Sequence, residues 1–164
     1  AGPDQPRAMP ADAGASLRIE INRLEHGAQI AAAIPRPYDP INSMVISRVT
    51  SEGNCLGGVI YDDFTTGCVF MHQASFGRNW LTGNMIWMVF DYPFNKLHVR
   101  KVAGVVNSSN HELLAFNQRL GFKEEARIKG AYADGDMIVL TMERADCRWL
   151  KIKPKVYQKD PTDE

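Results

Sequence analysis

Apolar and polar residues alternate where the patterned part of the chain begins. Leu17, Ile19 and Ile21 are separated by charged residues, and this period of two is typical of a strand with one buried face. The next stretch, 25–34, is rich in alanine and stops before Pro35, which predicts a short helix. Further prolines then indicate an extended connection.

Three apolar segments with turn residues between them follow. Residues 43–50, 56–61 and 68–74 are short and rich in β-branched or aromatic residues. The turns at 51–54 and 62–67 contain Gly, Asn, Asp and Thr. Such turns favour strands that reverse direction, so we expect an antiparallel meander.

The period of the pattern changes after this meander. From Trp80 to Leu97, apolar residues recur at helical spacing. Asn79 has a side chain suited to the N-cap of this helix, and Pro93 is expected to kink or end it. The β-branched stretch Val99 to Val106 then predicts a buried central strand.

A further helix is predicted from Glu112 to Leu120. Its start carries two capping candidates, Asn110 and Ser109, and Gly121 supplies a stop.

Two strands, 122–130 and 137–144, complete the pattern and are joined by a turn at 133–135. The predicted order is therefore strand, helix, three antiparallel strands, helix, strand, helix and two strands. This order predicts an α/β (α+β) fold with a mixed central sheet of about six to seven strands flanked by helices.

Composition fits one globular domain. The 164 residues are 45% hydrophobic and 23% charged, which is close to the average for globular proteins. We expect a flexible N-terminal arm at 1–16, one domain at 17–150 and a polar C-terminal tail at 151–164. The formal net charge is zero, so no overall charge attracts nucleic acid or an anionic membrane.

The cysteines are three in number and form no CxxC pair. This pattern predicts reduced thiols in a cytoplasmic protein, with neither a disulfide framework nor a metal site. The residues concerned are Cys55, Cys68 and Cys147.

Three pieces of sequence in the second half of the chain carry a family resemblance. Tyr92-Pro93-Phe94 closes the long helix, Asn110 stands eleven positions before Gly121-Phe122, and Asp136 to Met142 forms the last strand. In this order they resemble the GNAT (GCN5-related N-acetyltransferase) family, and most closely its ribosomal-protein N-terminal acetyltransferase branch. The ending Arg148-Trp149-Leu150 also resembles small GNAT-like proteins of phages and bacteria.

This resemblance implies the GNAT acyl-CoA N-acyltransferase fold. It also implies transfer of an acetyl group from acetyl-CoA to a primary amine, which would be a protein N-terminus, a lysine or a small amine. In this fold the fourth and fifth strands diverge, and the pantetheine arm of the cofactor lies between them. Here those strands are 68–74 and 99–106, which makes Met71 and Gln73 candidate cofactor contacts.

The family binds the cofactor diphosphate with a loop of pattern Gln/Arg-x-x-Gly-x-Gly/Ala at a helix start, where backbone N–H groups face the anion. Aligned from Gly77, this chain lacks the leading residue and both glycines. Arg78 would then supply a charge-assisted contact instead. The alternative is an ordinary exposed arginine, with Trp80 filling the cleft. The candidate loop residues are Gly77, Arg78, Asn79, Trp80, Leu81 and Thr82.

Asn110 resembles the family asparagine whose side chain contacts the pantetheine arm or the loop after the fifth strand, and helix capping is its alternative or additional role. Asn117 stands where many relatives carry a tyrosine that protonates the leaving thiolate. An asparagine has no proton to give at a suitable pKa. Phe116 beside it is a candidate cofactor contact, and core packing is the alternative.

A base that takes the proton of the amine is not obvious from the sequence. His72 lies on the fourth strand and titrates near neutral pH, but a satisfied core histidine is the more common case. Asp62 and Asp63 fit a solvated turn or recognition of an amine. Tyr132, near the last hairpin, is a candidate for the acceptor side or for packing.

Two classes of function therefore stand side by side. The first is an acetyl-CoA-dependent N-acetyltransferase without a metal cofactor. The second is a GNAT-like binding or structural module that lacks turnover, which the missing glycines and Asn117 favour. Proteins with the GNAT fold often pair through sheet edges or C-terminal segments, so a homodimer is an open alternative.

Overall fold

The computed structural model describes residues 17–34 and 36–152. The predicted arm at 1–16 lies outside the described residues, and so does the predicted tail beyond Ile152. Lys151, the first residue of that predicted tail, ends a 3-10 turn at Arg148–Lys151.

Seven strands of the described chain form one mixed sheet in the order β1-β2-β3-β4-β5-β7-β6. All neighbours are antiparallel except β4 and β5, which are parallel. The predicted meander and the mixed sheet are thereby confirmed. The strands are β1 Arg18–Ile21, β2 Met44–Val49, β3 Cys55–Asp62, β4 Cys68–Ser75, β5 Lys101–Asn107, β6 Lys123–Tyr132 and β7 Gly135–Glu143.

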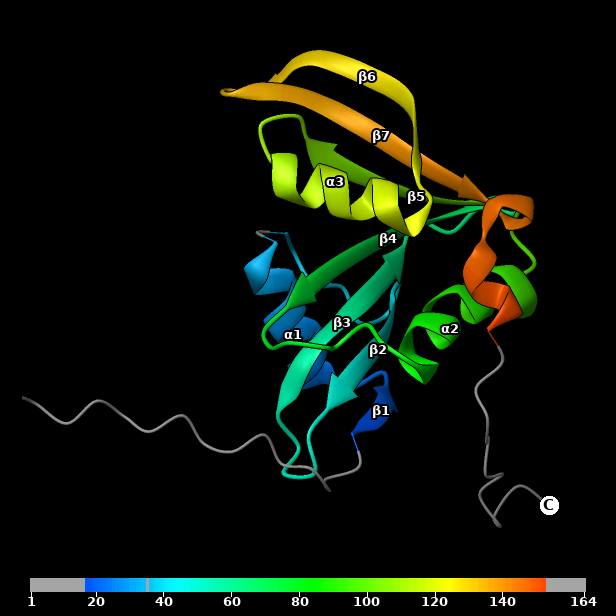
Figure 1. The fold of residues 1–164 in the computed structure, drawn as a ribbon. Coiled ribbons are helices and arrows are strands. Elements are labelled where there is room, and N and C mark those ends of the chain that lie inside the picture. The colour runs from blue at the N-terminus through cyan, green and yellow to red at the C-terminus, as the bar shows by residue number, and fades with distance from the viewer. Residues whose placement is uncertain (1–16, 35, 153–164) are drawn as a thin grey trace, which may run out of the picture.

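Three α-helices cover the two faces of this sheet (Figure 1). Helix α1, Leu24–Ala33, packs through Ile30 on Val45 and Ile60. The opposite face carries the larger core, which α2 and α3 close. The ranges of these two helices are Asn84–Asp91 for α2 and His111–Leu120 for α3.

The ends of α3 follow the sequence signals closely. The side chain of Asn110 accepts a hydrogen bond from the backbone N–H of Leu113 at 3.1 Å, which makes it the N-cap. Gly121 ends the helix in a left-handed conformation with φ of 114°. Both predictions are confirmed, because capping depends on residues within a few positions of the helix end.

The start of α2 differs from the sequence prediction. The helix begins at Asn84, with Gly83 before it at φ 55° and ψ −127°, a backbone conformation that suits glycine. Asn79 sits in a left-handed turn at φ 59° and is therefore no N-cap. Trp80 is drawn out of the helix by a tertiary contact. Its ring packs so closely on Gly57 of β3 that a Cβ there would lie 2.7 Å away.

The end of the long helix follows its proline. After Asp91 the chain continues as a π-helical turn at Tyr92–Lys96, in which Pro93 takes the second position. This change agrees with the predicted kink or end, because proline lacks the N–H that an α-helix interior needs.

Candidate functional site

Strands β4 and β5 are paired along only part of their length. Their parallel register covers three residue pairs and ends at Phe70 opposite Ala103. Beyond that pair β4 continues to Ser75 and β5 to Asn107, and the two strands diverge (Figure 1). Gly104, Val105 and Asn107 of β5 are only partly buried, although the β-branched sequence predicted a strand enclosed throughout. Val106 between them is buried in the core.

A cavity of about 740 Å³ lies where the strands diverge. Its volume is in the range of small-molecule and cofactor sites. Met71 and Gln73 reach it from the face that α3 covers, whereas Phe70 and His72 reach it from the face of α1. The cavity therefore opens on both faces of the sheet. Further lining residues are Arg36, Asp63, Gly104, Val105, Asn110, Leu113, Asn117 and Tyr132.

A directional hydrogen-bond chain crosses one wall of this cavity. Asn117 donates through Nδ2 to the backbone carbonyl of Leu113 at 3.0 Å, which fixes the orientation of its amide. Its Oδ1 then accepts from Nε2 of Gln73 at 3.3 Å. This leaves Oε1 of Gln73 buried without a protein donor among the described residues. A buried acceptor without a donor is costly, and the residue that carries it lines the cavity.

On the other face, three side chains form a closed ionic network. Asp62 accepts from Nη2 of Arg36 at 2.7 Å and from Nε2 of His72 at 2.7 Å. Nη1 of Arg36 donates to Nδ1 of His72 at 3.2 Å. Both ring nitrogens are thus engaged, and His72 is held as the neutral tautomer. Burial lowers the pKa of His72 and outweighs the Asp62 carboxylate, which raises it, while Arg36 acts in the same direction as burial.

The sequence predicted His72 but not this network, because its members come from three distant segments. Arg36 follows α1, Asp62 ends β3 and His72 lies on β4. The register of β3 and β4 places Ile60 opposite His72 and Asp62 opposite Phe70. One sequence signal was available. Side chains alternate between the two faces of a strand, and Asp62 on β3 and His72 on β4 both occupy positions that face α1.

The predicted cofactor loop does not line the cavity. Arg78 is exposed, Trp80 packs on Gly57, and Oγ1 of Thr82 donates to the carbonyl of Asn79 at 3.0 Å. Among the described residues, the backbone N–H groups of 78–83 donate to no other residue. They are therefore without a protein acceptor in the loop that precedes α2. Phe116 is also absent from the cavity wall and packs against the core.

The position of the helix start also changes how this loop compares with the family pattern. Because α2 begins after Gly83, the loop before it runs from Arg78 to Gly83. In this frame Arg78 takes the leading position and Gly83 the last one, while Leu81 replaces the middle glycine. An alignment from Gly77 is one residue out of step with the helix.

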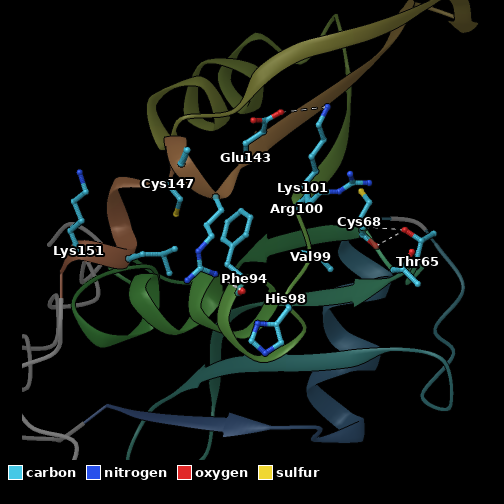
Figure 2. A pocket seen from close by; sticks show the side chains of 15 residues that line it. Thr65, Cys68, Phe94, His98, Val99, Arg100, Lys101, Glu143, Cys147 and Lys151 are labelled. Carbon is cyan, nitrogen blue, oxygen red and sulfur yellow. Dashed lines mark hydrogen bonds and ion pairs between the residues drawn. The ribbon is translucent and has the colours of Figure 1, made fainter.

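A second, wider hollow of about 1290 Å³ lies at the other end of β4 and β5 (Figure 2). Its lining mixes apolar side chains, such as Phe94 and Leu150, with polar or charged ones, such as His98, Arg100 and Lys101. Lys101 forms an ion pair with Glu143, its neighbour on the adjacent strand β7. Arg144 is tied to the carbonyl of Phe94 at 2.6 Å. This hollow lies where the strands are still paired, so it does not open between them.

Two further findings concern the described residues only. No three of their His, Cys, Asp and Glu side chains lie close enough together to hold a metal ion. None of their helices has the length and apolar character that crossing a membrane requires.

Solved structures with the same architecture include spermidine N-acetyltransferase SpeG of Vibrio cholerae. One single-residue mutant of SpeG matches with a TM-score of 0.63 at 12% identity, over 79% of this chain and 94% of that one. A structure of two other mutant forms matches with a TM-score of 0.55 at 14% identity, over 63% and 66%. A dodecameric SpeG structure gives 0.55 at 15% identity, over 63% and 66%.

The comparisons by sequence give no match. No protein-family model and no curated protein matches the chain. The likeness therefore rests on architecture: a seven-stranded mixed sheet, flanked by helices, whose two parallel strands diverge. The chain has the GNAT acyltransferase fold.

Proposed function

We propose that this protein is an N-acetyltransferase that transfers an acetyl group from acetyl-CoA to a primary amine. The observation that carries the proposal is the cavity where β4 and β5 diverge, because it opens on both faces of the sheet. Two reactants can therefore approach one point from opposite sides. Holding them in line there supplies much of the rate of a transfer reaction.

The residues on the α3 face fit the pantetheine arm of coenzyme A. The arm carries amide N–H groups, and Oε1 of Gln73 is a buried acceptor that lacks a donor among the described residues. Met71 and Asn110 line the same wall, and Asn110 does so while it caps α3. The free backbone N–H groups of 78–83, together with Arg78, fit the diphosphate at the start of α2.

The amine would then approach from the α1 face. The groups there are Arg36, Asp62, Asp63 and His72. Because Asp62 is shared by Arg36 and His72, Asp63 is the carboxylate left to attract an ammonium group. A single free carboxylate suits a monoamine, a lysine or a protein N-terminus better than a polycation such as the spermidine named for SpeG.

Proton transfer in this proposal does not use the predicted catalytic residues directly. His72 has both nitrogens engaged, so it would orient the acceptor wall and leave the amine proton to water. Asn117 has both amide groups engaged and carries no acidic proton. Asn117 would therefore position Gln73. When the amine takes the acetyl group, the thiolate of coenzyme A would leave without a tyrosine to protonate it.

The fully bonded Asn117 also favours a second function, which is a module that binds coenzyme A without turnover. The two functions share the cavity and differ in the fate of the thioester. Self-association as a homodimer stays a prediction of the resemblance, and sedimentation of the purified chain would measure it.

Thermal melting with and without acetyl-CoA tests the shared part of the proposal. Binding to the folded state at a hundred times the Kd stabilises it by about 2.7 kcal/mol. For a chain of this size that raises the midpoint by roughly 5 to 10 °C. Mass spectrometry of a panel of amines incubated with acetyl-CoA then separates the functions. Acetylated product supports the enzyme, a shift without product supports the module, and no shift at millimolar acetyl-CoA refutes both.

A further inference from the structure

Arg48 on β2 is a buried cation without an anionic partner among the described residues. Only 6% of its surface is exposed, and no carboxylate of the described chain lies within ion-pair distance. Burial lowers the pKa of its guanidinium, and no neighbouring charge opposes that effect. Removing a cation from water costs free energy unless an anion compensates it. The burial of Arg48 without such an anion therefore needs an explanation.

The side-chain hydrogen bonds of Arg48 lead to the start of α2. Nη1 donates to Oδ1 of Asn84 at 2.9 Å, and Nη2 donates to the carbonyl of Thr82 at 3.1 Å. Nε is buried and has no acceptor among the described residues. Both partners are themselves exposed. The charge therefore lies directly beneath a surface loop.

Three independent features make this loop electropositive. The backbone N–H groups of 78–83 are unpaired within the described chain, and the positive end of the α2 dipole lies beside them. Arg78 adds a second cation on the outside. The sequence between Asp63 and Asp91 contains no Asp or Glu, so no acidic residue of this segment neutralises the site.

We propose that Arg48 is a positioning residue for a diphosphate group bound at the start of α2. From beneath the loop, it supplies the positive charge that the ligand neutralises. This inference rests on the proposed function, in which the diphosphate belongs to coenzyme A. It adds a residue from the antiparallel meander, far from the loop in sequence, to that site.

Because the hydrogen-bond partners of Arg48 are exposed, the stability of an Arg48 variant distinguishes charge supply from a purely structural role. If Arg48 served only to fasten the loop, removing it would destabilise the protein. If it is an uncompensated charge, an apolar residue of similar volume should leave the free protein equally stable or more stable. Water can solvate Thr82 and Asn84 after the change, because both are exposed.

Calorimetric titration of Arg48→Met, Arg48→Lys and the unmodified protein tests the proposal, with coenzyme A, pantetheine and inorganic pyrophosphate as probes. Pantetheine lacks the diphosphate, and pyrophosphate is the diphosphate alone. Arg119→Met makes the same chemical change at an exposed arginine on α3 and is the matched control.

For Arg48→Met we expect the Kd of coenzyme A and of pyrophosphate to rise about tenfold. The Kd of pantetheine should change less than about twofold, and the melting temperature should not fall. Arg48→Lys keeps the charge and should retain most of the affinity, and Arg119→Met should match the unmodified protein.

Unchanged affinity of Arg48→Met for coenzyme A would overturn the inference while leaving the proposed function intact. Equal losses for pantetheine and coenzyme A, with a lower melting temperature, would also overturn it, because they indicate a structural latch. If the unmodified protein binds pyrophosphate through Arg48 but does not bind coenzyme A, the proposed function fails and the anion site stands. If it binds neither probe, both fail.

Discussion

Gly104 lies on β5 immediately beyond Ala103, the last residue that pairs with β4. A Cβ added at Gly104 would meet only the carbonyl oxygen of Met71, at 3.5 Å, which is ordinary van der Waals contact. Beyond that Cβ lies the cavity. The substitution Gly104→Leu therefore places a branched side chain in the space that we assign to the cofactor arm, without a clash in the free protein.

The expected size of the effect follows from this geometry. Forcing an extra side chain against an occupied space costs about 1 to 3 kcal/mol, which corresponds to a loss of affinity of roughly 5- to 150-fold. The free protein should keep its melting temperature to within a few degrees, because the leucine enters open space and glycine is a poor strand residue.

Titration calorimetry with coenzyme A measures this loss directly, and Gly104→Ala is the graded control. The alanine variant adds only the tolerated Cβ and should bind within about threefold of the unmodified protein. Equal affinity of the leucine variant would refute the reasoning, because the cofactor arm would then run elsewhere. A large fall in melting temperature would refute the claim that the space beside Gly104 is open.

Three further predictions concern the scaffold. Asn110→Ala removes the N-cap of α3. It should destabilise the fold by about 1 kcal/mol, which lowers the melting temperature by roughly 2 to 4 °C. An unchanged midpoint in a thermal melt would show that the cap is dispensable. Gly57→Ala adds a Cβ 2.7 Å from the Trp80 ring and 2.9 Å from the carbonyl of Ala74, so urea unfolding should show a loss of about 1 to 3 kcal/mol, and wild-type stability would contradict this packing. Because burial lowers the pKa of His72 from its ordinary value of 6.5, the unfolded chain binds a proton near this pH that the folded chain does not. The free energy of unfolding should therefore fall as the pH drops below 6.5. His72→Gln should flatten this dependence of stability on pH, whereas equal slopes for the two proteins would mean that His72 titrates alike in both states.

Features encoded within a few residues could be predicted from the sequence. The alternation of Leu17, Ile19 and Ile21 correctly indicated a strand, but the predicted buried face is wrong, because Leu17 and Ile21 are exposed at this edge of the sheet. The turn residues of the meander indicated its antiparallel course. Asn110 and Gly121 marked the ends of α3 because a cap and a left-handed stop act locally. The divergence of β4 and β5 was expected only through the family resemblance.

Features that depend on distant contacts were missed or placed wrongly. Trp80 and Leu81 continue the helical period of α2, yet Trp80 leaves the helix to pack on Gly57, which is remote in sequence. Periodicity cannot distinguish a core contact made by a loop from one made by a helix. The network of Arg36, Asp62 and His72 was hidden for the same reason.

Arg48 shows a different limit of sequence reading. In the run Val45-Ile46-Ser47-Arg48-Val49 it occupies an alternating position of a strand, where an arginine normally faces solvent. In the structure it is buried and donates to Thr82 and Asn84 at the start of α2, which are remote in sequence. An arginine in the middle of an otherwise apolar strand can be recognised in a sequence as a candidate buried charge. The sequence does not show which residues its guanidinium contacts.

The most direct test of the account is a crystal structure of the protein with coenzyme A. We expect the pantetheine arm between β4 and β5, with an amide N–H toward Oε1 of Gln73 and the diphosphate at the start of α2. Coenzyme A bound only in the hollow beside His98, or strands paired beyond Phe70 and Ala103 with no room between them, would contradict the central claim.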